Sequence, residues 1–244
     1  MPELSADTVA YWVSRDIANV NFRPLVDVTT DVLASHLTAK SPEQRAELAE
    51  SVIPRLMPAL ERIRGELLDD GVEPNFELSN DEKTYYIRAI ESSASEVLDR
   101  LLLLSPGGFE HFCARVLESM GGKCTVTGKS GDGGIDFVGR DLALCVPAPV
   151  GARITVIGQA KRYARNNIIS EAELRSFVGS VMRKTHDPDD PICFRRSILA
   201  PVAFAFWTTS DFQPSARKFA RGLGLWYLNG TALAQLSLRL GLGI

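Results

Sequence analysis

The chain lacks a long hydrophobic run, and this absence excludes several classes of protein. Its longest apolar stretch is the 10 residues from Ile198 to Trp207, which include Pro201, whereas a membrane-spanning helix needs roughly 20. The sequence does not open with a basic segment followed by an apolar one, so we expect no secretory leader. The composition, 45% apolar and 23% charged over 244 residues, excludes a disordered or fibrous chain. We therefore expect a soluble, cytoplasmic protein with no membrane partner and with one large or two small domains.

Cysteine and histidine are scarce and widely spaced. The sequence has four cysteines and three histidines, and no two cysteines form a Cys-x-x-Cys pair. A zinc ribbon, a zinc finger and a thioredoxin-type redox motif are therefore excluded. We expect reduced cysteines that act as small hydrophobic residues.

A complete nucleotide-binding loop is also lacking. Gly128-Lys129-Ser130 is similar to the end of a Walker A motif, but that motif requires a glycine five residues earlier, where this chain has Lys123. The motif also requires a helix directly after it, whereas a glycine-rich turn and a strand-like segment follow here. We therefore expect no nucleotide cofactor.

The charges are unevenly distributed along the chain. The net charge is −3 overall, but residues 1–105 carry 10 Lys and Arg against 19 Asp and Glu, a net charge of −9. Residues 106–244 carry 17 Lys and Arg against 11 Asp and Glu, a net charge of +6. Such an asymmetry hints at a polyanionic partner for the basic half. We therefore predict an acidic region over 1–105 and a separate domain over 106–244.

The acidic region has mainly helical patterns. A capping box begins at Ser41, with Gln44 as its reciprocal partner, and the apolar residues after it keep a helical period. Pro54 and Pro58 interrupt this helix, so we expect a kink or a break there. The other expected elements are helices over 7–20, 27–38 and 85–104, and a loop or short hairpin over 71–83.

The second domain alternates between helical and strand-like patterns. Ser105 and Pro106 mark the start of a helix, and Gly121-Gly122 marks its end. The order of the later elements predicts an α/β sheet domain. Strands are expected over 123–127, 134–140, 153–162, 202–208 and 225–228, and helices over 170–183, 213–222 and 231–240.

Polar residues interrupt two of these strands at their ends. The glycine-rich run 131–134 delivers Asp136 to a strand, and its glycines permit positive φ and the close approach of another chain. Gln159 and Lys161 end an otherwise apolar strand. They share one face while Ala160 points away, because side chains alternate along a strand.

Glu110 is a third unusual polar residue. It lies in helical register with Cys113 and Leu117, so it borders the apolar face of its helix. A carboxylate that leans towards a core needs a partner such as a metal ion or a cation.

These groups together predict a site for a hard metal ion. The carboxylates of Asp136 and Glu110 suit Mg²⁺, and the side-chain oxygen of Gln159 or the carbonyl of Ala160 can complete the shell. Lys161 supplies a positive charge near an attacking water and a phosphate. Such a site fits phosphodiester hydrolysis, with Mg²⁺ as the expected cofactor and Mn²⁺ as a substitute.

The order of the motifs resembles the PD-(D/E)xK nuclease superfamily, and most closely its Mrr-type restriction endonucleases. The resemblance covers about residues 106–240 and implies a restriction-endonuclease-like mixed β-sheet flanked by helices, preceded here by a mainly helical N-terminal region. The motifs that carry it are Phe109-Glu110, Gly121-Gly122, Ser130 to Asp136, Gln159 to Tyr163, Thr208 to Phe212 and Leu228 to Gly230.

The resemblance also implies a role for each candidate catalytic residue. Asp136 matches the metal-binding aspartate, and Lys161 matches the lysine that assists the nucleophilic water. Glu110 matches a helix glutamate that often joins the metal shell. Gln159 stands where many relatives have glutamate, so one anionic ligand fewer faces the metal.

Basic and polar residues beside this site are candidates for binding the phosphates of DNA. They are Arg162, Tyr163 and Arg165 after the strand, and Lys129 and Ser130 in the turn. We expect double-stranded DNA as the partner. We also expect a homodimer, because a double-strand cut needs two sites.

The sequence therefore predicts a Mg²⁺-dependent DNA endonuclease of the Mrr restriction type, which defends a bacterial cell against foreign DNA, including modified DNA. Three alternatives stay open: a nuclease like a Holliday-junction resolvase, a DNA-binding module that does not cut, and a partner-dependent subunit. Mrr-type proteins often carry a DNA-reading domain such as a winged helix, but the acidic region lacks a basic helix. Its role in dimerisation, regulation or recognition stays open, as does that of a loop expected over 141–152.

Overall fold

A computed structural model of the chain describes residues 4–90, 93–127, 134–143, 153–186 and 201–243. The candidate DNA-binding residues Lys129 and Ser130, the glycines at 131 and 133, and most of the expected 141–152 loop lie outside these residues. The chain divides into two compact units, Met1–Ser92 and Ser93–Ile244. None of the helices in the described ranges is long and apolar enough to cross a membrane.

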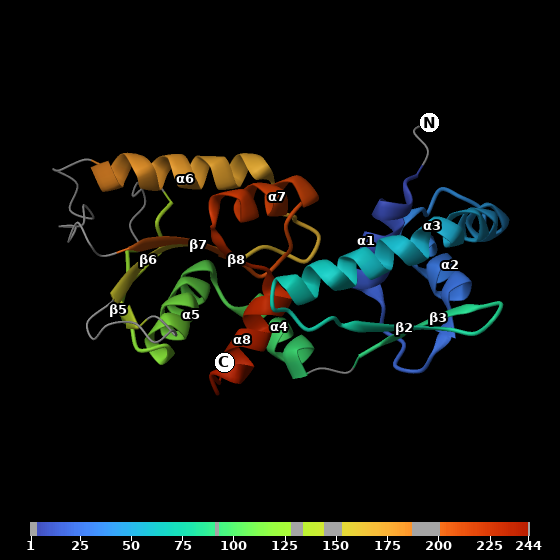
Figure 1. Cartoon of the computed structure of the whole chain (residues 1–244), viewed down its shortest axis with the longest axis horizontal. Helices are drawn as coiled ribbons and strands as arrows, with labels where there is room; N and C mark the ends of the chain where they lie inside the picture. Colours follow the sequence, from blue (N-terminus) through green and yellow to red (C-terminus); the bar gives the residue numbers. More distant parts are fainter. Residues whose placement is uncertain (1–3, 91–92, 128–133, 144–152, 187–200, 244) are drawn as a thin grey trace. The chain divides into compact units, whose positions relative to one another are not determined.

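The first unit combines three helices with a small antiparallel sheet (Figure 1). The three strands pair in the order β1-β3-β2, so the C-terminal hairpin is completed by the short strand β1. Three helices followed by such a hairpin form the topology of a winged helix. The elements are α1 (Ala6–Asp16), β1 (Arg23–Pro24), α2 (Leu25–His36), α3 (Pro42–Asp69), β2 (Phe76–Asn80) and β3 (Tyr85–Ala89).

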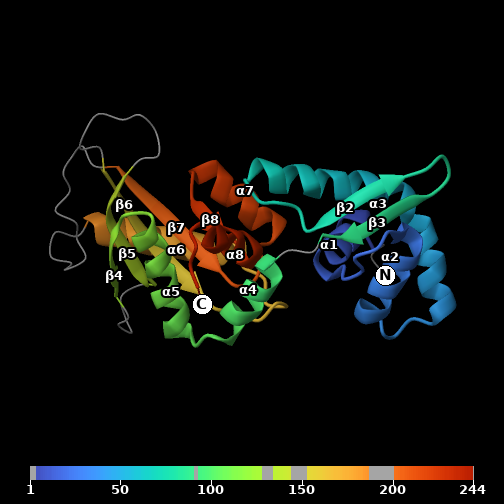
Figure 2. The same cartoon turned by 90° about the horizontal axis from the view of Figure 1, so that it is seen from below.

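The capping box predicted at the start of α3 is confirmed. The Ser41 hydroxyl accepts a hydrogen bond from the Gln44 amide, and the Gln44 side chain accepts one from the Ser41 amide. The helix runs without a break through Pro54 and Pro58. Its ribbon changes direction part-way along its length (Figure 2), as the expected kink requires.

The helix predicted over 85–104 is wrong in its first part. Residues Tyr85–Ala89 form β3, and a helix, α4, covers only Ser93–Leu103. Asp81 explains the difference, because its carboxylate accepts hydrogen bonds from the amides of Lys83 and Thr84 and thereby closes a hairpin turn. The turn sets the register in which β3 buries Ile87.

The second unit is built around a five-stranded mixed sheet, which confirms the predicted fold class. The strands lie in the order β4-β5-β6-β7-β8; the first three pair antiparallel, and β6, β7 and β8 pair parallel. Its other elements are α5 (Pro106–Ser119), β4 (Lys123–Val126), β5 (Phe137–Ala143), β6 (Arg153–Lys161), α6 (Glu171–His186), β7 (Val202–Thr208), α7 (Pro214–Leu223), β8 (Trp226–Leu228) and α8 (Gly230–Arg239).

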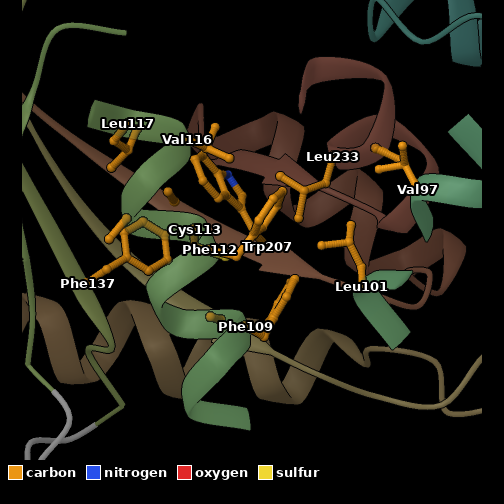
Figure 3. Packing of buried hydrophobic residues seen from close by; sticks show 14 of the residues in the cluster. Val97, Leu101, Phe109, Phe112, Cys113, Val116, Leu117, Phe137, Trp207 and Leu233 are labelled. Carbon is orange, nitrogen blue, oxygen red and sulfur yellow. The ribbon is translucent and has the colours of Figure 1, made fainter. Parts of the chain in front are cut away.

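Helices cover both faces of this sheet and form two hydrophobic cores. On one face, α4, α5 and α8 pack around Phe137 and Trp207 (Figure 3). On the other face, α6 and α7 pack around Ile157 and Phe206. Because α4 packs against α8, the second unit starts at Ser93 and not after Ser105, where the sequence suggested the boundary.

Candidate active site

Asp136 lies immediately before β5, and backbone pairing fixes its position. Its amide donates to the carbonyl of Gly158 at 2.9 Å, and its carbonyl accepts from the amide of Thr127 at 3.0 Å. The side chain is fixed as well, because Oδ2 accepts a hydrogen bond from the amide of Ala160 at 2.8 Å. The carboxylate therefore lies across the end of β6, directly beside the Gln159-Ala160-Lys161 segment.

Gly134, two residues before Asp136, has a positive φ and lies close to the side chain of Gln159. Gly134 has a φ of +80°, and a Cβ atom at this position would lie only 2.5 Å from Nε2 of Gln159. Gln159 itself is 8% exposed. The backbone conformation at 134 therefore favours glycine, and a Cβ atom there would displace the Gln159 amide.

The side chains at the end of β6 point to alternate faces. Ala160 belongs to the core beneath α5, whereas Ile157 belongs to the core beneath α6 and α7. By alternation, Gln159 and Lys161 share one face of the strand, as predicted, and this is the face that bears Ile157. Lys161 is half-buried, and its carbonyl accepts hydrogen bonds from the amide of Thr209 and the hydroxyl of Thr208.

Glu110 borders the buried face of α5, as its helical register predicts. It is half-buried, and Cys113, three residues further along the helix, is fully buried among Phe112, Phe137 and Trp207 (Figure 3). Burial raises the pKa of the Cys113 thiol well above its ordinary value, and the charges of Asp136 and Glu110 raise that pKa further. Both carboxylates therefore act electrostatically on one buried thiol.

The metal ligands expected from the sequence all carry oxygen donors. Two carboxylates, a side-chain amide and a backbone carbonyl offer oxygen ligands of the kind that Mg²⁺ and Mn²⁺ accept. In the described ranges, no group of three or more His, Cys, Asp or Glu side chains could hold a metal ion. The set named here contains only two such side chains, Asp136 and Glu110.

The candidate DNA-binding residues differ in their surroundings. The Nε of Arg162 is buried and lacks a hydrogen-bond partner in the part of the chain that the structure describes. Tyr163 is half-buried and donates its hydroxyl proton to Glu173 at 3.0 Å. Arg165 is exposed and forms an ion pair with Asp99 on α4.

Glu173 caps α6 together with Ser170, and it also contacts Tyr163, which sequence reasoning missed. Its carboxylate accepts hydrogen bonds from the amide and hydroxyl of Ser170 and from the hydroxyl of Tyr163. Burial acts to raise the pKa of Glu173, but these hydrogen bonds and the charge of Lys161 hold it below its ordinary value. The spacing of Ser170 and Glu173 is the signal of a capping box, which gives no hint of the contact with Tyr163.

Thr208 and Thr209 belong to the motifs of the family resemblance, which implies no role for them. Both are buried, with exposed fractions of 0% and 1%, and both bond to the end of β6 and the segment that follows it. A run of hydroxyl residues at the end of an apolar strand is the sequence signal that could have pointed to them.

The chain was compared with known protein families and solved structures. Residues 101–190 match the family Mrr_cat, described as restriction endonuclease. The matched segment contains Glu110, Asp136, Gln159 and Lys161. The resemblance predicted from the sequence is thereby confirmed over these residues. No curated protein matches the chain.

Comparison with solved structures returns restriction endonucleases at low similarity. The MspJI restriction endonuclease in complex with a 27-mer oligonucleotide has 21% identity and a TM-score of 0.42, covering 63% of this chain and 36% of that one. AspBHI, a DNA modification-dependent restriction endonuclease, has 17% identity and a TM-score of 0.45, with 63% and 37% covered. The restriction endonuclease FokI bound to DNA has 13% identity and a TM-score of 0.40, with 89% and 45% covered. The chain therefore spans less than half the length of each of these proteins.

Proposed function

We propose that this chain, whose residues 101–190 match a restriction endonuclease family, is a metal-dependent DNA endonuclease of the Mrr type. The observation that carries the proposal is the hydrogen bond from the Ala160 amide to the Asp136 carboxylate. It holds an anionic oxygen donor at the end of the strand that bears Gln159 and Lys161. Metal-assisted hydrolysis of a phosphodiester uses anionic metal ligands beside a cation in this way.

Asp136, Glu110, Gln159 and the carbonyl of Ala160 would hold the metal ion. A bound Mg²⁺ or Mn²⁺ would supply a polarised water and a positive charge that offsets the negative charge on the phosphate oxygens. The protein's own part is to fix the donors: Asp136 is held by Ala160, and the Gln159 amide is held against Gly134. Lys161 adds a cation from the same face of β6 as Gln159 and orients the attacking water.

Double-stranded DNA is the proposed substrate. The half-buried Arg162, which directly follows Lys161, supports this, because a guanidinium is a charged donor that suits a phosphate. Arg165 would bind a phosphate by exchanging its ion pair with Asp99. We further propose a homodimer, in which two such sites cut both strands, and a cytoplasmic role against foreign DNA, including modified DNA.

Plasmid cleavage tests this function. The purified protein is incubated with matched methylated and unmethylated supercoiled plasmids, in the presence of Mg²⁺, Mn²⁺ or EDTA. We expect nicked or linear plasmid with Mg²⁺ or Mn²⁺ and intact plasmid with EDTA. A difference between the two plasmids would identify dependence on modification.

The same assay separates the remaining alternatives. DNA that is bound but left intact with either ion would support a binding module, or a subunit that needs a partner. Preferential cleavage of four-way junctions over linear duplex would support a resolvase-like nuclease. Cleavage that persists in EDTA would contradict the proposed metal dependence.

A further inference from the structure

Strand β7 ends in a run of buried hydroxyl residues. The exposed fractions of Thr208, Thr209 and Ser210 are 0%, 1% and 7%. A buried hydroxyl destabilises a fold unless it is hydrogen-bonded. All three hydroxyls find partners in one place, the end of β6 and the segment that follows it.

Two of these residues bond to the backbone around the proposed catalytic lysine. The hydroxyl of Thr208 donates to the carbonyl of Lys161 at 2.8 Å, and the amide of Thr209 donates to the same carbonyl at 3.2 Å. The hydroxyl of Thr209 accepts from the amide of Tyr163 at 2.9 Å and donates to the carbonyl of Tyr163 at 2.7 Å. We call Thr208 and Thr209 the hydroxyl clasp.

The clasp continues the sheet beyond the end of β6. Pairing between β6 and β7 ends at Lys161 and Thr208, so the residues after Lys161 have no strand partner in this ladder. The Thr209 hydroxyl forms hydrogen bonds with both the amide and the carbonyl of Tyr163. It thus replaces the backbone pairing that a further strand residue would provide. Arg162 lies between the two residues that are held.

We propose that Thr208 and Thr209 are positioning residues of the nuclease: they fix the backbone that presents Lys161 to the reacting water and Arg162 to the DNA. The inference rests on the proposed function, because it concerns the geometry of that reaction. A catalytic group must be held closely, since a displacement of about 1 Å can lower a rate on the order of 100-fold. Both threonines are buried, so the proposed role is to position other residues and not to contact DNA.

Thr209→Val removes the clasp hydroxyl while keeping the shape of the side chain, and Thr209→Ser keeps the hydroxyl. The matched control is Thr29→Val in the first unit, where another fully buried threonine hydroxyl donates to a backbone carbonyl, that of Leu25, at 2.7 Å. We expect Thr209→Val to lower kcat for plasmid cleavage on the order of 10-fold or more. The KM for DNA should rise by a smaller factor, and Thr209→Ser and Thr29→Val should retain kcat.

Hydrogen exchange at the Tyr163 amide tests the clasp independently of cleavage. We expect faster exchange of this amide in Thr209→Val, and unchanged exchange in Thr29→Val. If Thr209→Val does not fold, Thr208→Val replaces it, since the ladder bond from the Thr209 amide still holds Lys161 in that variant. Thr208→Val should lower kcat by a smaller factor than the one expected for Thr209→Val.

The outcomes distinguish the inference from the function on which it rests. Faster exchange at Tyr163 with an unchanged kcat would overturn the positioning role and leave the nuclease intact. An equal loss of kcat in Thr29→Val would also overturn it, because the effect would then come from stability alone. A wild-type protein that cleaves no DNA would overturn the proposed function and, with it, the inference.

Discussion

At the scale of single residues, the carboxylate of Glu173 links the N-terminus of α6 to the segment after β6. One carboxylate oxygen accepts from the hydroxyl of Tyr163, and the other accepts from the amide and hydroxyl of Ser170. The charge of Lys161 also acts on this carboxylate. Glu173 therefore favours its ionised form in the folded state more than in the unfolded chain.

The lowered pKa of Glu173 predicts the pH dependence of stability. The ionised form contributes stability above the ordinary value of 4.5, and this contribution disappears as the pH falls through the lower pKa of the folded protein. Glu173→Gln should therefore be less stable than the wild type near neutral pH, and the difference should shrink on acidification. Urea unfolding between about pH 6 and about pH 3 measures this.

Tyr163→Phe is the matching variant for this measurement. It removes one of the hydrogen bonds that lower the pKa of Glu173. The stability of this variant should therefore depend on pH less than that of the wild type and more than that of Glu173→Gln. A stability difference between Glu173→Gln and the wild type that stays constant over this pH range would contradict the account.

At the scale of elements, the predicted site depends on how the turn before β5 meets the end of β6. Gly134 combines a positive φ with the contact to Gln159. Gly121 is a natural reference because it has a similar φ of +87°, and a Cβ atom there would meet no other atom within 4 Å. Substitution at Gly121 therefore tests the effect of the positive φ alone, whereas substitution at Gly134 tests the positive φ together with the contact to Gln159.

Gly134→Ala should destabilise the protein more than Gly121→Ala. Both alanines adopt an unfavourable φ, which costs about 1 kcal/mol, but only the alanine at 134 also displaces the Gln159 amide. We expect Gly134→Ala to lower plasmid cleavage at temperatures where it is folded, and Gly121→Ala to retain it. Thermal unfolding and cleavage rates measure the two effects, and equal behaviour of both variants would contradict the role of the contact.

The elements of the second unit could be predicted because their signals are local. Strand alternation placed Gln159 and Lys161 on one face, and the register of α5 placed Glu110 at the edge of its buried face. The clasp between Thr209 and Tyr163 joins residues 46 positions apart, and the ion pair between Arg165 and Asp99 joins residues 66 positions apart. No local pattern specifies such partners. The strand after the turn at Asp81 was mistaken for part of a helix for a different reason, because the turn signal is local and was overlooked.

At the scale of the whole molecule, the uneven charge follows the division into units. The unit Met1–Ser92 carries 9 Lys and Arg against 17 Asp and Glu, a net charge of −8, and Ser93–Ile244 carries 18 against 13, a net charge of +5. The boundary differs from the one expected after Ser105, yet the difference in sign persists. The basic unit contains every residue of the proposed site, which suits a polyanionic substrate.

The acidic unit shows why topology and charge must be weighed separately. Its helices and sheet have the order of a winged helix, a topology that binds DNA in many proteins, but its net charge of −8 disfavours contact with phosphates. We therefore assign catalysis and phosphate binding to the second unit, and the proposed function makes no use of the first.

The most direct test of the central claim compares two lysine variants of the second unit. Lys161→Ala removes the proposed catalytic cation, and Lys218→Ala removes an exposed lysine from α7. Plasmid cleavage with Mg²⁺ and DNA binding by electrophoretic mobility shift are measured for both. We predict that Lys161→Ala lowers cleavage by at least about 100-fold with DNA binding largely retained, and that Lys218→Ala cleaves like the wild type. Cleavage by Lys161→Ala at the wild-type rate would contradict the assignment of this site.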